Sequence, residues 1–140
     1  MNRIISLSIL LMLAGCSNAE NDALLSLFEY RQSNARETTC LSVFGNDPSA
    51  ELLTRIHKHN ANVVPSSECI QKPYGGYLYK GQNVLYKMKI EKSSWLGPRK
   101  ISFEVAYVTG GKFGSSGELI VVEKLNEFWV LTKREMTWIS

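Results

Sequence analysis

The fold of this chain is decided by the stretch Val84-Leu85-Tyr86-Lys87-Met88-Lys89-Ile90-Glu91. Its apolar residues fall at every second position and alternate with mostly polar ones, which is the repeat of a strand with one buried face. The same repeat is found over residues 101–107 and 119–123, and a fourth strand is predicted over residues 128–138, after a tight turn at Asn126-Glu127. Because the connections between these segments are short, neighbouring strands should pair antiparallel. The second half of the chain therefore predicts a four-stranded meander.

The first half of the chain has helical periodicity instead. Asp22 is a suitable N-cap, and the apolar residues after it predict a helix that ends near Ala35. Asp47-Pro48 predicts the start of a second helix, with the aspartate as N-cap and the proline in the first turn, that continues to about Asn60.

Two further segments of the first half are predicted to be extended. Residues 38–44 have the composition of a short strand, and Pro65 excludes a helix over residues 63–69. Together these elements predict an α+β domain over residues 22–140, in which two N-terminal helices pack on a curved, mainly antiparallel sheet of about four to five strands.

Residues 1–15 are typical of a cleaved secretory leader. One basic residue, Arg3, precedes an apolar run over residues 4–14 that ends in small residues. As a helix, this run would span roughly 16 Å, which is about half of the hydrocarbon core of a bilayer. The run is therefore too short for a transmembrane anchor.

The residues Leu13-Ala14-Gly15-Cys16 resemble the lipobox of bacterial lipoproteins. The resemblance implies cleavage before Cys16 and acyl chains on that cysteine that hold the protein on a membrane. Ordinary secretion beside a coincidental cysteine is the alternative. Because Ser17 rather than aspartate follows, the sorting habit of enterobacteria favours the cell envelope at the outer membrane, facing the periplasm. Residues 16–21 would be the lipidated cysteine and a tether.

Cys40 and Cys69 remain once Cys16 carries lipid. In an oxidising envelope such a pair predicts one disulfide. It would close a loop of about 30 residues and stabilise the fold by roughly 3.5 kcal/mol in the chain-entropy estimate. Two free buried thiols, or one reactive thiol with a bystander, are the alternatives.

The composition favours neither nucleic acid nor a cofactor. A formal net charge of +3 and an envelope location do not point to a nucleic-acid partner. His57 and His59 invite a metal interpretation, but on a helix they point about 200° apart and cannot share one ion. The glycine-rich run over residues 110–117 lacks the Gly-Lys-Ser or Gly-Lys-Thr order of a phosphate-binding loop and predicts a hairpin loop. We therefore expect no metal and no cofactor.

A pair of carboxylates is the remaining catalytic candidate. Glu104 with Glu118 or Glu123 would lie on neighbouring strands, and two such carboxylates could in principle form a glycosidase pair. Alternation places Glu104 on the face opposite the apolar residues, however, so a solvated sheet surface also explains it. A small envelope hydrolase that uses these carboxylates or His57 is therefore an alternative function rather than the leading one.

The segment over residues 72–100 has the most suggestive composition. It carries seven lysines or arginines and one carboxylate, Glu91, with tyrosines interleaved. Tyrosine supplies rigid contact area and lysine attracts anionic partners, whereas a solvated lysine face with aromatics that close the end of the sheet is the alternative. The predicted binding patch consists of Tyr74, Tyr77, Tyr79, Lys80, Lys87, Lys89, Lys92 and Trp95.

From Thr39 to its end the chain also resembles small secreted proteobacterial domains of unknown function. The resemblance is carried by short motifs, namely Asp47-Pro48, Leu52-Leu53, Ser67 before Cys69, Gly110-Gly111, Trp129-Val130 and Trp138-Ile139-Ser140. It implies one domain over this range and supplies no catalytic residue.

These features predict a non-catalytic binding module of the cell envelope, of an inhibitor or immunity type. Acyl chains on Cys16 would hold it at the membrane, and an envelope protein or an anionic polymer would be its partner. A small hydrolase and a structural or assembly accessory lipoprotein are the alternatives.

Overall fold

Strands dominate this protein, whose computed structural model describes residues 18–29, 37–110 and 114–140. Residues 18–29 are helical. The elements that follow are β1 (Thr39–Val43), α2 (Ala50–His57), β2 (Val63–Pro65), the 3₁₀ turn η2 (Ser66–Glu68), β3 (Ile70–Gln71), β4 (Tyr77–Tyr79), β5 (Gln82–Val84), β6 (Lys87–Gly97), β7 (Lys100–Val108), β8 (Ser116–Leu125) and β9 (Phe128–Ile139).

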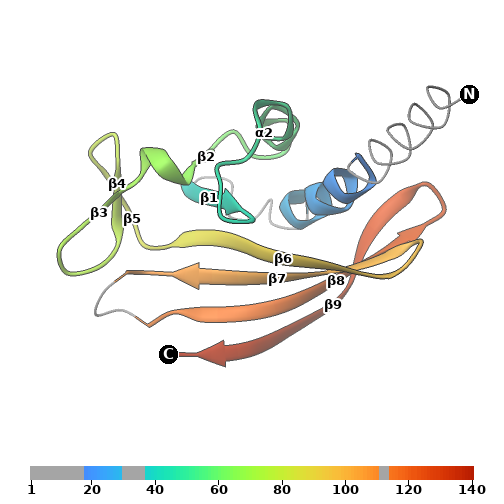
Figure 1. Ribbon diagram of the computed structural model, residues 1–140. Helices are drawn as coiled ribbons and strands as arrows, with labels where there is room; N and C mark the ends of the chain where they lie inside the picture. The colour runs from blue at the N-terminus through green and yellow to red at the C-terminus, as the bar shows by residue number, and fades with distance from the viewer. Residues whose placement is uncertain (1–17, 30–36, 111–113) are drawn as a thin grey trace, which may run out of the picture.

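The strands form two sheets (Figure 1). The larger has six strands in the order β2-β1-β6-β7-β8-β9, and the smaller has three in the order β3-β4-β5. Within the larger sheet β1 runs parallel to both β2 and β6, whereas β6 to β9 pair antiparallel in sequence order. The small sheet lies at the end of the molecule where β6 begins.

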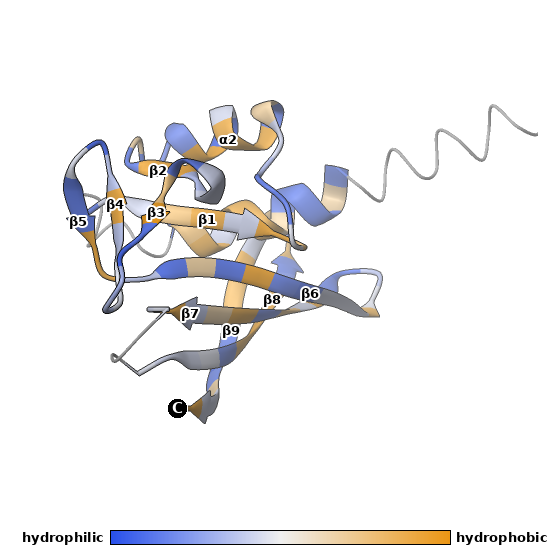
Figure 2. Ribbon diagram, turned by 60° about the vertical axis from the view of Figure 1, so that its left-hand side comes forward, coloured by the Kyte–Doolittle hydropathy of each residue, from blue (hydrophilic) through white to orange (hydrophobic). Residues whose placement is uncertain are grey.

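The main core lies between one face of the larger sheet and the two helices (Figure 1). Leu24 and Leu27 on the first helix and Ile56 on α2 are almost fully buried, as are Phe103 on β7 and Ile120 on β8. Successive side chains of a strand point to opposite faces, and the bands of alternating hydropathy along β6 in Figure 2 show this pattern. The side chains of the meander that face the helices are therefore mainly apolar, and they form the core.

The α+β prediction was wrong, because the fold is mainly β. Within the described residues the protein has nine strands in two sheets rather than four to five in one, and its helices do not form a separate layer of comparable size. The unpredicted strands β3, β4 and β5 have two or three residues each. Strands this short carry no measurable alternation, so only their tertiary pairing defines them.

The predicted meander itself is confirmed by the antiparallel pairing of β6 to β9. Its first strand begins at Lys87 rather than Val84, because Val84 belongs to β5 and pairs with Tyr77. The predicted strand at residues 38–44 is confirmed as β1. Residues 63–69, expected to be extended, contain the 3₁₀ turn η2 after β2.

Both helices start at other residues than predicted. The N-cap of α2 is Ser49, whose Oγ accepts a hydrogen bond of 3.2 Å from the Leu52 amide, because Asp47 is occupied elsewhere. The first helix already includes residues 18–21, which were expected in a tether. Its predicted end near Ala35 lies outside the described residues.

Candidate functional site

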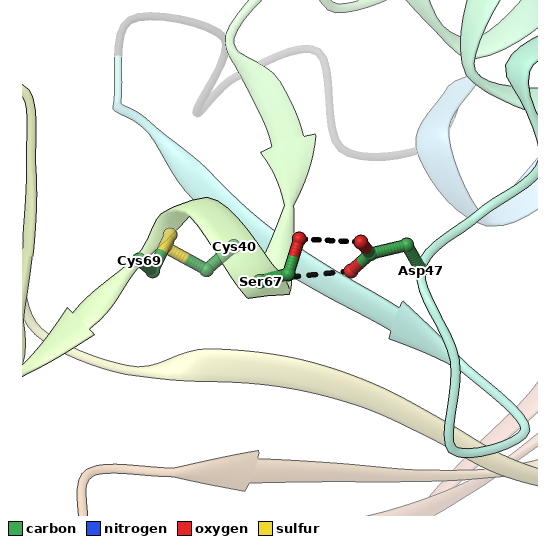
Figure 3. The surroundings of a disulfide bond; sticks show 4 residues. All are labelled: Cys40, Asp47, Ser67 and Cys69. Atoms are coloured by element: carbon green, nitrogen blue, oxygen red, sulfur yellow. Dashed lines mark hydrogen bonds between the residues drawn. A yellow bond between two sulfur atoms is a disulfide. The ribbon is translucent and has the colours of Figure 1, made fainter.

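The small sheet is joined to the larger one by a disulfide. Cys40 on β1 and Cys69 before β3 form the predicted bond, with a Cα–Cα distance of 6.4 Å (Figure 3). Both cysteines pack with Val64, Tyr77 and Val84 in a second buried cluster. The disulfide thus fixes the position of three short strands that could not form a stable sheet by themselves.

A carboxylate supports the same junction. Asp47 accepts a hydrogen bond of 3.0 Å from the Ser67 amide and one of 2.5 Å from its hydroxyl, and Figure 3 shows both beside the disulfide. These bonds, with a smaller contribution from the charge of Lys87, lower the pKa of Asp47. The side chain that was expected to cap α2 therefore ties the loop before α2 to η2.

Two of the predicted patch tyrosines lie on the inner face of β4 and are contacted by lysines. Tyr77 is almost fully buried, and this burial raises its pKa. Lys87 Nζ lies 4.7 Å from the centroid of the Tyr77 ring, and Lys80 Nζ lies 5.4 Å from that of Tyr79. Both distances are within the range of cation–π contacts.

The outer face of the small sheet, opposite Tyr77 and Tyr79, carries both apolar and polar residues. Ile70 pairs with Leu78, and Leu78 pairs with Asn83, so the three side chains share a face. Lys72 Nζ donates a hydrogen bond of 3.0 Å to Asn83 Oδ1 on this face. Ile70 and Tyr74 are 69% and 74% exposed, respectively. Apolar, aromatic and cationic groups are thus available to solvent at one small sheet.

The small sheet also has an unbalanced charge. No aspartate or glutamate occurs over residues 69–90. In the part of the chain that the structure describes, no carboxylate lies within 4.0 Å of the ammonium groups of Lys72, Lys80 or Lys87. These cations are therefore held by aromatic and amide groups and stay available to an anionic partner.

The remaining patch residues lie elsewhere. Lys89 pairs with Ala106, and Lys92 with Glu104, both on the outer face of the larger sheet. Trp95 pairs with Ile101 on the helix-facing side, where its ring packs edge-to-face with Trp129 at a centroid distance of 6.0 Å. The structure therefore divides the eight predicted residues between the small sheet and two faces of the larger one.

The catalytic candidates are also dispersed. Glu104 lies on the outer face, whereas Glu118 pairs with Val105 on the helix-facing side. His57 on α2 is hydrogen-bonded through Nε2 to the Val63 carbonyl at 2.7 Å, and His59 Nε2 lies 3.3 Å from Glu29 Oε1. Among the described residues no three potential metal ligands gather at one point.

One polar cluster was not predicted as a unit. The Glu118 carboxylate, 8% exposed, accepts hydrogen bonds from the Tyr107 hydroxyl and, at 2.5 Å, from Arg134 Nε. Tyr86 packs edge-to-face against Tyr107 at 5.4 Å. Because its three polar members come from β7, β8 and β9, only the strand register could have revealed it. Its contacts neutralise a buried charge at the edge of the core.

A cavity of about 410 Å³ lies beside β5, between the first helix, the start of β1 and the β5–β6 connection. Phe28, Tyr86 and Met88 supply its apolar lining, and Asn60 and Asn83 are among its polar residues. Of the lining residues that the structure describes, Glu37 alone is charged. The cavity therefore brings no pair of titratable groups to one point.

Cys16 and the leader lie outside the described residues. None of the helices in the described ranges is long and apolar enough to cross a membrane. Comparisons of the chain with protein family models, curated proteins and solved structures found no match.

Proposed function

We propose that this chain is a lipid-anchored protein of the cell envelope that binds the acidic surface of another protein through its small sheet. In this proposal it acts as a non-catalytic module of an inhibitor or immunity type. The observation that carries the proposal is that the lysines around the small sheet form no salt bridge within the described chain. We call Ile70, Lys72, Tyr74, Lys80 and Lys87 the small-sheet cluster.

The mixture of side chains favours a protein over an anionic polymer. A polyanion needs little besides positive charge, whereas protein interfaces combine charge with aromatic and apolar contact area. Ile70 and Tyr74 supply exposed apolar and aromatic surface beside Lys72. The lysines would accelerate the encounter with an acidic partner, and Ile70 and Tyr74 would supply the area that is desolvated in the complex.

The proposed anchor would keep the domain close to the membrane surface. Cys16 precedes the first described helical residue, Asn18, by two positions, so the acylated residue would lie within roughly 7 Å of the folded domain. Two or three acyl chains hold a protein durably on a membrane. A partner would therefore be bound at the envelope surface rather than in solution.

The anchor is tested with the variant Cys16→Ser and the matched control Ser17→Ala. We expect wild type and the control to be found in the membrane fraction with an acylated amino terminus by mass spectrometry, and Cys16→Ser to be released. An unmodified Cys16 in the wild-type protein would contradict the anchor.

Binding is tested by replacing Lys72, Lys80 and Lys87 together with serine. The control replaces Lys58, Lys92 and Lys100, which are exposed and lie outside the cluster, so both variants lose the same charge. The partner is first captured by chemical crosslinking in intact cells, and its affinity for the three proteins is then measured with purified components. We expect the cluster variant to bind at least about tenfold more weakly, with the control close to wild type.

Two outcomes would contradict this proposal. Equal binding by all three proteins would remove the small sheet as the site. Binding of the wild-type protein to vesicles that contain anionic lipid or lipopolysaccharide, with no protein captured, would replace the proposed protein partner by an anionic polymer.

A further inference from the structure

The two edges of the larger sheet differ in length and composition. The edge strand β2 has three residues and ends at Pro65, whereas the edge strand β9 has twelve residues. Within the described chain β9 pairs with β8 alone, so one side of its backbone has no strand partner. Its exposed large apolar side chains are Phe128, Val130, Met136, Trp138 and Ile139.

The centre of β9 carries opposite charges on one face. Lys133 and Glu135 both lie on the outer face, with Nζ and Oε2 3.2 Å apart. Arg134 between them points to the helix-facing side, where its Nε is 2.5 Å from Glu118 Oε2. The arginine is therefore neutralised within its own subunit, and the outward charges of the strand are one cation and one anion.

We propose that a second copy of this chain occupies the β9 edge, antiparallel and with the two-fold axis at Arg134. Lys133 then lies opposite Glu135 of the second copy, and Glu135 opposite Lys133 of the second copy. A register centred one residue earlier or later places Lys133 opposite itself or Glu135 opposite itself. Since unlike charges stabilise a cross-strand pair and like charges destabilise it, the charges select the register centred on Arg134.

The apolar residues match in the same register. Val130 and Trp138 both lie on the outer face, because their partners on β8 are Glu123 and Gly117. They become cross-strand neighbours in the dimer, as do Trp129 and Ile139 on the opposite face. The Trp138 indole packs over Gly117, where an added Cβ would overlap it. This contact restricts the indole before association, so less side-chain entropy is lost when the dimer forms.

Charged side chains and bulges usually protect an edge strand from pairing with other chains. The β8–β9 ladder has two register shifts, and Lys133 to Glu135 lie between them. This protection is selective here. Lys133 and Glu135 repel a strand that places like charges opposite them, whereas an antiparallel second copy of β9 places opposite charges there. The inference does not rest on the proposed function of the small sheet.

Charge reversal tests the proposal on the full chain, purified in a mild detergent and measured by analytical ultracentrifugation. We expect wild type to sediment as a dimer. Lys133→Glu and Glu135→Lys should each raise the dimer dissociation constant at least about tenfold, because two symmetry-related pairs change from attraction to repulsion. The double variant K133E/E135K should form dimers again.

Mixing the two single variants provides the decisive control. Lys133→Glu presents two anions and Glu135→Lys presents two cations, so an equimolar mixture should form heterodimers although each variant alone dimerises weakly. Formation of heterodimers on mixing would also show that both single variants are folded. If the wild-type protein stays monomeric at all concentrations, the proposal is overturned. The β9 edge would then be open to pairing with a strand of another protein. Single variants that stay dimeric would overturn it too, because the dimer would use another surface.

Discussion

The meander and the disulfide-linked half of this protein are stabilised in different ways. In the meander β6 to β9, strands of nine to twelve residues pair with their neighbours in sequence and bury one apolar face under the helices. The disulfide-linked half consists of β1, β2, η2 and the small sheet, whose strands have two to five residues. It has a small buried cluster of its own, the Cys40–Cys69 bond and the Asp47–Ser67 hydrogen bonds.

This difference concerns function because the small-sheet cluster lies on the half with the smaller core. Regions with few buried apolar contacts open at lower free energy than the core of the same domain. The disulfide and the Asp47 carboxylate offset that deficit close to the lysines, since Lys87 contributes to the lowered pKa of Asp47. We therefore expect changes in the meander to affect global stability and changes in the disulfide-linked half to affect one end of the molecule.

The largest expected effect comes from truncation of the meander core. Phe103→Ala removes a ring that is fully buried between β7 and the helices, and should lower the free energy of unfolding by about 3–5 kcal/mol. Urea denaturation followed by circular dichroism measures this loss. Phe128→Ala is the matched control, because Phe128 is 74% exposed and its truncation should change stability by less than about 0.5 kcal/mol. Similar losses for both variants would contradict the assignment of the core.

The second effect should be confined to the other half. Replacing Cys40 and Cys69 together with alanine removes a constraint worth roughly 3.5 kcal/mol in the chain-entropy estimate. In native-state hydrogen exchange, we expect the amides of β1 and β4 to lose more protection than those of β7 and β8. The wild-type protein treated with a reductant should show the same pattern. Equal loss in both halves would mean that the protein unfolds as one cooperative unit, and that the two halves are not distinct.

The same contrast explains how much of the fold could be predicted from the sequence. The meander was predictable because β6 and β7 have a clear alternation in sequence and each strand pairs with the next one along the chain. The pairing of β1 with β6 and the formation of the small sheet depend on contacts between residues far apart in the chain. Such contacts leave no local pattern, and they account for the wrong fold class.

The candidate site was predictable only in part, and a bulge explains why. Simple alternation places Lys87, Lys89 and Trp95 on one face of β6. The register shift between Ile90 and Lys92 reverses the faces beyond it. Trp95 therefore joins Trp129 on the helix-facing side instead of the lysines. The tyrosines of β4 did gather with Lys80 and Lys87, because Lys80 follows Tyr79 directly and Lys87 starts the strand after β5, which pairs with β4.

The smallest effect should come from the hydrogen bonds of Asp47. The pKa of this carboxyl is lowered in the folded state, first by the Ser67 hydroxyl and then by the Ser67 amide. Its contribution to stability is therefore complete at neutral pH and is lost as the pH falls below about 4 toward the folded-state pKa. Because the side chain is exposed, we expect Asp47→Asn to cost only about 0.5–1 kcal/mol at pH 7.

The pH dependence distinguishes this effect from a general loss of stability. The difference in unfolding free energy between wild type and Asp47→Asn should shrink as the pH is lowered from 7 to 3, because the wild-type carboxylate becomes protonated while asparagine does not titrate. Ser67→Ala should reduce the same pH dependence by removing the hydroxyl donor, whereas Glu127→Gln in the exposed turn before β9 should leave it unchanged. A difference that stays constant across this range would show that the charge of Asp47 does not stabilise the disulfide-linked half. The disulfide and the small buried cluster would then stabilise this half without a contribution from that charge.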